Sequence, residues 1–323
     1  MGRYVFGVDI GGTTVKLGLF GEEGCLLDKW EIPTIKENQG ASILPDVAAS
    51  IREKMEEKGI GEPDVAGIGV GAPGAVDDEG TLVGGAVNIG WKAFNIPKAL
   101  GAYINVQVKA ANDANAAAYG EMWQGGGKGS NHMVAVTLGT GVGGGIVVNG
   151  ELLMGAAGAG GEIGHIHLAD EETESCGCGN KGCLEQYASA TGIARLAKRR
   201  LAQDEKESIL RKKAISAKSV FDAVKAGDEV AIEIAEQFGD YLGKGLAAVA
   251  AVVNPEVFVI GGGVSKAGEI LLSYVEPAFR KYAFHQCRGA KFVLAKLGND
   301  AGIYGAAGLI ISTLCKGKQF NDQ

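Results

Sequence analysis

The segment YVFGVDIGGTT, residues 4–14, has the pattern of a buried strand followed by a glycine-rich turn. The apolar run Tyr4–Asp9 predicts the strand, and the run Val15–Phe20 predicts a second strand that returns beside it. A plain hairpin turn needs fewer glycines and no aspartate at the strand end. Glycines let backbone N–H groups approach a ligand closely, and threonine hydroxyls add donors. The segment therefore favours a turn that holds phosphate oxygens.

The same arrangement returns about one domain length later, in MVAVTLGTGVGGGIVV at residues 133–148. A strand leads into the turn Gly139–Gly141, and the next strand ends at the hairpin signal Asn149-Gly150. Such an internal repeat indicates two related halves, each with a phosphate turn. We expect an α/β protein with a small first domain over residues 1–115, completed by a C-terminal helix over 300–323. A larger α/β domain would occupy residues 116–299, and the chain is long enough for two cores.

Further predicted strands also end in candidate site residues. The strand Val65–Val70 leads into the turn GAPG at 71–74, and Val257–Ile260 leads into a third glycine turn, Gly261–Gly263. Asn88 follows in an irregular segment, where asparagine most often forms a turn. These segments could bring backbone groups to a ligand, or they could be simple connections.

Asn112 and Asp113 lie between a predicted strand, Val106–Ala110, and a helix that runs to Trp123. Either residue suits a helix N-cap, which is the purely structural interpretation. The carboxyl end of a strand is also where open α/β sheets place their active sites.

Three of the six cysteines fall within eight positions, in CGCGNKGC at 176–183, and His165 lies eleven residues upstream. Close-spaced thiols with one imidazole are the ligands of a structural zinc site. The alternative is three buried, inert thiols, but Cys176, Cys178 and Cys183 lie in a polar, glycine-rich run without apolar periodicity. The spacing therefore predicts zinc held by His165 and the three cysteines.

Two carboxylates flank this cluster, Glu162 before His165 and Glu185 after Cys183. A bound metal would fix both in space. His165 could bind zinc through one ring nitrogen and offer the other to a ligand.

The composition excludes several classes of protein. A net charge of −7 without a basic patch argues against nucleic acid as the main partner. The apolar runs are short and broken by glycine, so we expect no membrane span, and the first strand follows Met1 too closely for a signal peptide. These features predict a cytoplasmic protein, where reduced thiols favour metal binding over disulfides.

The ordered motifs of the chain are DxGGT at 9–13, GxPG at 71–74, ND at 112–113, LGTGxGGG at 138–145, ExGH at 162–165, CxCxxxxC at 176–183 and GGG at 261–263. This set resembles the ROK family (repressors, unassigned frames and sugar kinases), and most closely its bacterial glucokinases. The resemblance spans nearly the whole chain. It implies the two-domain actin-like ATPase and hexokinase fold, with a cleft between the domains, and a homodimer.

The resemblance also implies roles for individual residues. The phosphates and magnesium of Mg-ATP would be held by Asp9, Gly11, Gly12, Thr13, Thr14, Lys16, Gly139, Thr140 and Gly141, and the adenosine by Gly261, Gly262 and Gly263. The sugar hydroxyls would be held by Gly74, Asn88, Asn112, Asp113, Glu162, His165 and Glu185.

Asp113 would be the general base in the ATP-dependent phosphorylation of a hexose, glucose to glucose 6-phosphate. Transfer of a γ-phosphoryl group to an alcohol needs a carboxylate that accepts the hydroxyl proton. The first-turn N–H groups of the following helix would help keep that carboxylate ionised.

Other functions stay open at this point. Fructose and N-acetylhexosamine kinases of the same family differ in hydroxyl geometry that a sequence does not reveal. A sugar-responsive repressor would carry a helix-turn-helix module, whereas only three residues precede the first strand here. An actin-like ATPase without a sugar acceptor would have no use for the predicted zinc-binding segment, residues 165–183 (the metal loop), or for Glu162 and Glu185 beside it.

Overall fold

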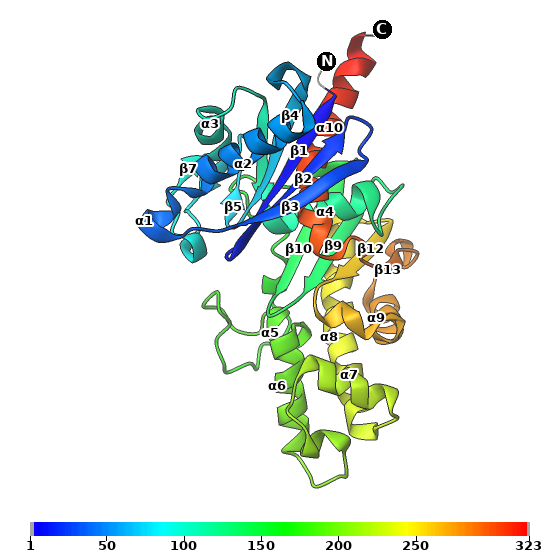
Figure 1. The fold of residues 1–323 in the computed structure, drawn as a ribbon. Coiled ribbons are helices and arrows are strands. Elements are labelled where there is room, and N and C mark those ends of the chain that lie inside the picture. Colours follow the sequence, from blue (N-terminus) through cyan, green and yellow to red (C-terminus); the bar gives the residue numbers. More distant parts are fainter. Residues whose placement is uncertain (1–2, 322–323) are drawn as a thin grey trace. The chain divides into compact units, whose positions relative to one another are not determined.

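The computed structural model describes residues 3–321, with side chains for residues 3–314. The chain divides into two compact units (Figure 1). The first consists of Met1–Gly129, Leu152–Gly161 and Asn299–Gln323, and the second of Ser130–Glu151 and Glu162–Gly298. Each unit combines helices with its own five-stranded sheet, so the α/β class is confirmed.

The sheet of the first unit has the strand order β3-β2-β1-β4-β8. Its strands are β1 (Tyr4–Ile10), β2 (Thr14–Gly21), β3 (Leu26–Pro33), β4 (Val65–Ala72) and β8 (Val108–Asn112). The strands β3, β2 and β1 form an antiparallel meander, and the pairing of β1 with β2 confirms the two strands expected from the sequence. β4 is parallel to β1 and β8 is parallel to β4, so the carboxyl ends of these three strands lie at one edge.

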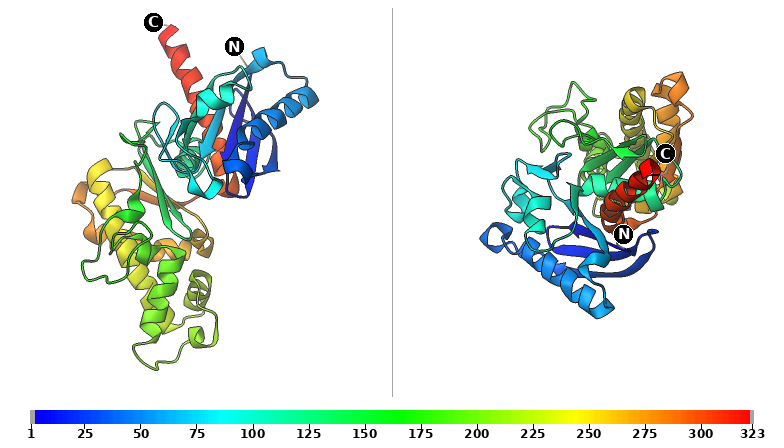
Figure 2. Two further views of the ribbon diagram at one scale, coloured as in Figure 1. Left: turned by 90° about the vertical axis from the view of Figure 1, so that its left-hand side faces the viewer. Right: turned by 90° about the horizontal axis from the view of Figure 1, so that it is seen from above.

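Alternate side chains of β1 enter two different cores, because successive residues of a strand point to opposite faces. Phe6, Val8 and Ile10 pack with the apolar face of α2 (Ile43–Lys58). Val5 packs on the other face with Ile303 and its neighbours on α10 (Ala301–Asn321). Figure 2 shows α10, in red, running beside the blue strands of this sheet.

Glycines allow α10 to approach the backbone of its neighbours. A Cβ on Gly69 of β4 would overlap the carbonyl group of Ala306. A Cβ on Gly305 of α10 would overlap the carbonyl oxygen of Ala116 in α4 (Asp113–Gln124). Since α4 packs on α10 along its length, it belongs to the first unit, which runs to Gly129. The boundary expected at residue 115 lies inside α4, whereas the first unit of the structure runs to Gly129. The packing of α4 on α10 explains why the whole helix belongs to the first unit.

The remaining elements of the first unit are short. A three-stranded sheet contains β5 (Ala75–Val76), β6 (Thr81–Val83) and β7 (Phe94–Asn95), and the helices are α1 (Glu37–Gly40), α3 (Ile96–Gly101) and the 3₁₀ turns η1 (Glu62–Asp64), η2 (Val87–Ile89) and η7 (Gly298–Asp300).

The sheet of the second unit has the order β11-β10-β9-β12-β13. Its strands are β9 (Met133–Leu138), β10 (Val142–Val148), β11 (Glu151–Leu152), β12 (Val257–Gly261) and β13 (Lys291–Leu294). β9 and β10 are antiparallel, whereas β12 is parallel to both β9 and β13. The pairing of β10, β9, β12 and β13 thus repeats that of β2, β1, β4 and β8, so the duplicated core predicted from the two hairpins is present.

The second unit is completed by helices around an apolar core. They are α5 (Glu185–Ala188), α6 (Ala190–Leu201), α7 (Ala217–Lys225), α8 (Glu229–Val253) and α9 (Glu269–Tyr282), with the 3₁₀ turns η3 (Ile163–His165), η4 (Ile209–Lys212), η5 (Val264–Ala267) and η6 (His285–Cys287). Phe258, Phe279 and Phe292 pack ring to ring, with centroids 5.0–5.3 Å apart, and join β12, β13 and α9.

Gly305→Ala should destabilise the first unit, because the new methyl group would push α10 away from the backbone of α4. Overpacking of this kind costs about 1–3 kcal/mol. Gly101→Ala is the matched control, since a Cβ on that helical glycine meets no atom within 4 Å. Thermal and urea denaturation of both variants measure the effect. Equal stability of the two would contradict the close packing of α10.

Candidate functional site

The first glycine turn, between β1 and β2, is fixed by hydrogen bonds to its own ends and to the residue after β3. Gly11 N donates to Thr14 O at 3.0 Å. Thr34 holds the turn twice, its hydroxyl donating to Gly11 O at 2.8 Å and its backbone N–H to Thr13 O at 2.9 Å. Thr13 itself is exposed. The turn is therefore a stable frame that presents Thr13 to solvent.

Asp9 is the penultimate residue of β1, beside this turn and opposite Lys16 in the strand pairing. Burial, and then the neighbouring Asp113 carboxylate, raise the pKa of Asp9 to about 6, while Lys16 acts in the opposite direction. Gly302 at the start of α10 makes room, since a Cβ there would collide with the Asp9 carboxylate. Lys16 Nζ donates to Asn299 O at 2.9 Å. Asp9 is thus a confined carboxylate that a cation would stabilise.

Asn112, rather than Asp113, is the N-cap of α4. Its Oδ1 accepts from Ala114 N at 3.0 Å and from Asn115 N at 3.1 Å. Its Nδ2 donates to Gly74 O and to Asp113 Oδ1, both at 3.0 Å. The amide therefore fixes the Gly74 turn and the Asp113 side chain at once. The capping role considered for either residue belongs to Asn112.

Asp113 is the first residue of α4, and its Oδ1 also accepts from Ala114 N at 2.8 Å. Parallel pairing of β1, β4 and β8 brings it to the same sheet edge as Asp9. Asn88, in η2, is close to the first turn, because a Cβ on Gly12 would lie 3.9 Å from its Nδ2. Asp9, Gly12, Asn88 and Asp113 therefore gather at one end of the first unit.

The second glycine turn, between β9 and β10, is held by the start of α6. Gly139 N donates to Gly141 O at 2.9 Å, and Ala190 N donates to Gly139 O at 2.8 Å. The Thr191 hydroxyl donates to Thr140 O at 2.8 Å. The start of α6 therefore supports the turn through bonds to two of its residues, Gly139 and Thr140.

Glu185 touches this second turn as well as the cysteine loop. Its Oε2 accepts from Val142 N at 3.0 Å, and a Cβ on Gly141 would overlap the same carboxylate. Its Oε1 lies 3.5 Å from Cys176 Sγ. Glu185 therefore links the turn assigned to phosphate with the loop assigned to metal, a contact that the sequence did not suggest.

The third glycine turn follows β12, whose last residue Gly261 pairs with Thr137 of β9. Gly262 has φ +83° and packs against the backbone of Leu138, where a Cβ would approach within 2.5–2.7 Å. Glycine is required there, because an L side chain would be both strained and crowded. Gly261–Gly263 and Gly139–Gly141 accordingly lie at one edge of the second sheet.

His165, Cys176, Cys178 and Cys183 form a cluster whose four ligand atoms all lie within 4.8 Å of one another. Cys178 Sγ is 3.7 Å from Cys183 Sγ, and Cys176 Sγ is 3.8 Å from His165 Nδ1. Two thiolates about 2.3 Å from a tetrahedral zinc ion are about 3.8 Å apart, so the Cys178–Cys183 pair has the spacing of two zinc ligands. Burial raises the pKa of the Cys183 thiol to about 12, and a bound cation would hold it as thiolate.

The ring of His165 is oriented by this cluster. Nδ1 faces Cys176, whereas Nε2 lies 3.9 Å from Glu162 Oε2. His167, two residues on, points elsewhere and contacts Lys181 O and Asp170 at 2.8 Å. One nitrogen of His165 is thus available for metal and the other for a ligand beside Glu162.

The sequence reasoning missed a group of charged residues that supports the metal loop. Glu172 of the loop is buried and bonds Arg195 and Arg199 of α6. The spacing of the two arginines, four residues apart on a helix, is a signal that they share a face. Nothing in the sequence selects Glu172 among the acidic residues around it.

No helix within residues 3–321 is long and apolar enough to cross a membrane. Comparison with known proteins matches the ROK family model to residues 5–313. Glucokinase of Halalkalibacterium halodurans is 43% identical over 313 residues, covering 95% of both chains. Glucokinase of Thermotoga maritima is 38% identical over 95% of this chain and 96% of its own.

Among solved structures, a ROK family glucokinase from Streptomyces griseus in complex with glucose and AMPPNP is 36% identical. It matches with a TM-score of 0.71 over 95% of this chain and 98% of its own. The ROK hexokinase from Thermus thermophilus is 32% identical, with a TM-score of 0.80 over 97% and 99%. These likenesses confirm the fold that the ordered motifs implied, and they establish that the chain belongs to the ROK family.

Proposed function

We propose that this protein is an ATP-dependent hexokinase that converts glucose to glucose 6-phosphate. The observation that carries the proposal is the pair of carboxylates at one edge of the first sheet, Asp9 and Asp113, which interact electrostatically. Phosphoryl transfer to an alcohol needs one carboxylate near the metal and one near the nucleophile. The glucokinases among its relatives support the same activity.

Asp113 is the general base in this proposal. It would accept the proton of a sugar hydroxyl, O6 of glucose, as that oxygen attacks the γ-phosphate of Mg-ATP. Asn112 Nδ2 and Ala114 N donate to its Oδ1, so the carboxylate is oriented and its negative charge is stabilised.

Mg-ATP supplies the transferred γ-phosphoryl group and the charge neutralisation that the reaction requires. The Asp9 carboxylate would bind magnesium, and the Lys16 ammonium group would bind phosphate oxygens. The two Gly-Thr turns would add backbone N–H groups and hydroxyls as further donors. Gly261–Gly263 would accommodate the adenosine. The proposed phosphate residues are Asp9, Gly11, Gly12, Thr13, Thr14, Lys16, Gly139, Thr140 and Gly141.

The sugar hydroxyls would bind Gly74, Asn88, Asn112, Asp113, Glu162, His165 and Glu185. In the second unit these groups depend on the metal loop, since His165 is itself a proposed zinc ligand and Glu185 contacts Cys176. Zinc would therefore have a structural role, fixing donors and acceptors on a rigid frame.

Asp113→Asn should lower kcat by roughly 10²-fold or more, because an amide does not accept the hydroxyl proton. Stability should barely change, since Asn112 rather than Asp113 caps α4. Glucose KM should stay near the parent value, as the amide oxygen still accepts a hydrogen bond. Asp46→Asn, in the first turn of α2, is the matched control. A kcat within a few-fold of the parent would remove Asp113 from the mechanism.

Cys178→Ser should lose zinc, and glucose KM should rise roughly tenfold because His165 and Glu185 lose their frame. The effect on ATP KM should be smaller, since Ala190 and Thr191 hold the Gly139–Gly141 turn independently. Cys25→Ser, at an exposed cysteine outside the cluster, controls for loss of a thiol. Metal analysis and steady-state kinetics on the same samples decide; unchanged glucose KM in a zinc-free variant would refute the coupling.

A coupled ADP-release assay across glucose, fructose, mannose and N-acetylhexosamines tests the substrate. We expect the highest kcat/KM for glucose and no ATP turnover without sugar. Hexose-independent turnover would instead identify an ATPase. Light scattering on the same sample tests the homodimer that we expect in the cytoplasm.

A further inference from the structure

The loop between His165 and Cys176 contains a carboxylate that is almost completely removed from solvent. The side chain of Glu172 is 1% exposed, although it lies in a stretch of mostly exposed acidic residues. An ionised carboxylate at such a site is costly unless its oxygens are fully hydrogen-bonded. The contacts of Glu172 meet this requirement.

Each oxygen of Glu172 accepts three hydrogen bonds. For Oε1 the donors are Thr173 N, Glu174 N and Arg199 Nη2, each at 3.0 Å, and for Oε2 they are Tyr187 OH at 2.6 Å, Arg195 Nη2 at 2.9 Å and Arg199 Nη1 at 3.1 Å. Arg199 therefore binds the carboxylate with both ends of its fork. This pairing, foremost, holds the pKa of Glu172 well below its usual range.

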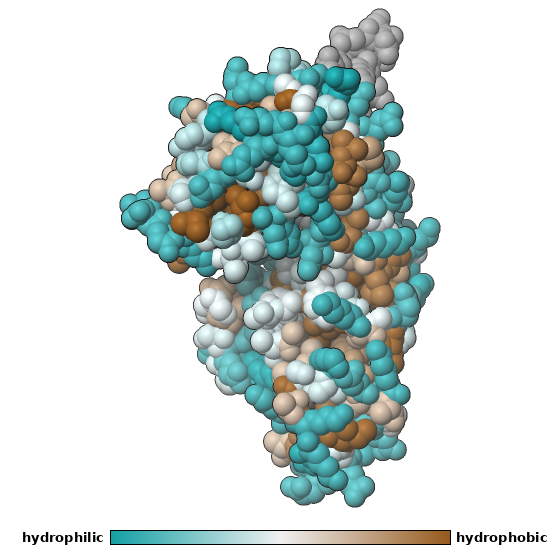
Figure 3. Space-filling model, viewed as in Figure 1, coloured by the Kyte–Doolittle hydropathy of each residue, from teal (hydrophilic) through white to brown (hydrophobic). Residues whose placement is uncertain are grey.

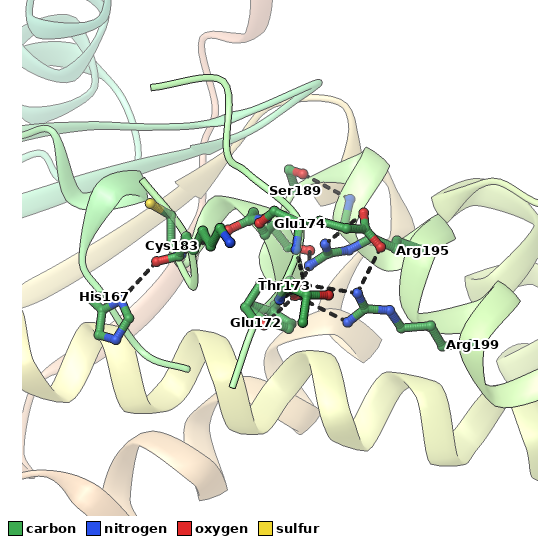
Figure 4. A network of polar contacts seen from close by, with 12 residues as sticks. His167, Glu172, Thr173, Glu174, Cys183, Ser189, Arg195 and Arg199 are labelled. Carbon is green, nitrogen blue, oxygen red and sulfur yellow. Dashed lines mark hydrogen bonds and ion pairs between the residues drawn. The ribbon is translucent and has the colours of Figure 1, made fainter. Parts of the chain in front are cut away.

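The partners of Glu172 come from two elements that follow the metal loop. Tyr187 belongs to α5, and its ring stacks on Tyr241 of α8 with centroids 3.9 Å apart. Arg195 and Arg199 belong to α6, and Figure 4 shows them converging on Glu172 and Glu174. The carboxylate thus fastens the loop to α5 and α6 together.

Neighbouring contacts extend this attachment to the metal ligands. Gln186 follows Glu185 on α5, and its Oε1 accepts from Cys183 N at 3.1 Å while its Nε2 donates to Glu174 O at 3.0 Å. Arg195 Nη2 also donates to Gln186 O at 2.8 Å. Cys183 is therefore connected to Glu172 through Gln186 and Arg195.

We propose that Glu172 is a positioning residue, which acts through the metal loop to fix His165 and Glu185 for sugar binding and to retain zinc. The sugar-binding part of this inference rests on the proposed function. The zinc part does not, because it depends only on the contacts of the loop.

Glu172→Gln tests the inference with almost no change in volume. An amide has a single acceptor oxygen, so its NH₂ group would face three donors that the carboxylate now satisfies. Zinc release to a chromogenic chelator should accelerate about tenfold or more, and glucose KM should rise by a similar factor. ATP KM and kcat should stay within about threefold, since removal of ground-state sugar contacts acts on KM.

Glu233→Gln, on α8, is the matched control, because Glu233 also pairs with an arginine of α6. Glu233 pairs with Arg200 Nε of α6 at 2.5 Å and with Lys206 Nζ at 2.9 Å, but its side chain is 37% exposed. The face seen in Figure 3 of the part that carries α6 and α7 in Figure 1 is a mixture of hydrophilic and apolar patches. The control makes the same Glu→Gln change opposite an arginine of the same helix, α6, and it should leave zinc release and glucose KM unchanged.

Arg199→Lys provides a second variant if Glu172→Gln does not fold. It keeps the charge but replaces the fork by a single ammonium group, so its effects should have the same direction and a smaller size. Parental zinc release together with parental glucose KM in both variants would overturn the inference, as would a parent protein that carries no zinc. A parent that phosphorylates no hexose would refute the proposed function instead, while the zinc-release rate would still decide the role of Glu172.

Discussion

Parallel pairing of β1 with β4, and of β4 with β8, brings the carboxyl ends of three strands to one edge of the first sheet. Asp9 and Asp113, more than a hundred positions apart in the chain, consequently interact, and the Asp113 carboxylate contributes to the raised pKa of Asp9. The same pairing of β9 with β12 brings two glycine turns together in the second unit. The proposed phosphate and proton chemistry depends on this property of parallel sheets, which collects strand ends irrespective of sequence distance.

Close backbone packing makes that geometry rigid. α10 lies on the sheet and on α4 partly through glycines, so that backbone contacts add to the side-chain packing of Val5 with Ile303. Gly302 continues this pattern to the site, where it leaves space for the Asp9 carboxylate. Because protein interiors are close-packed, the space for the Asp9 carboxylate depends on where α10 packs.

In the second unit the buried carboxylate of Glu172 holds the metal loop in place, as close packing holds the elements around Asp9 in the first unit. Glu172 is surrounded by six donors from the loop, α5 and α6, and Gln186 joins the same elements to Cys183. Glu185 continues the connection to Val142, beside the second glycine turn. The metal loop is thus attached at several points to the part of the unit that carries the Gly139–Gly141 turn. Loss of one of these attachments would affect sugar binding before phosphate binding, because the turn keeps separate bonds to α6.

The sequence by itself determined the α/β class, the duplicated hairpins, the family and the cluster of one histidine and three cysteines that could hold a metal ion. These depend on local patterns: apolar periodicity, glycine turns and ligand spacing within a few residues. Only the tertiary structure decided that Asn112 caps α4, that α4 belongs to the first unit, that Glu185 bonds Val142, and that Glu172 rather than its acidic neighbours is buried. Asn112 and Asp113 are both chemically able to cap the helix, and Glu172 does not differ chemically from the other glutamates near it. Such choices are made by contacts between residues far apart in the chain, because burial and hydrogen-bond partners exist only after the chain has folded.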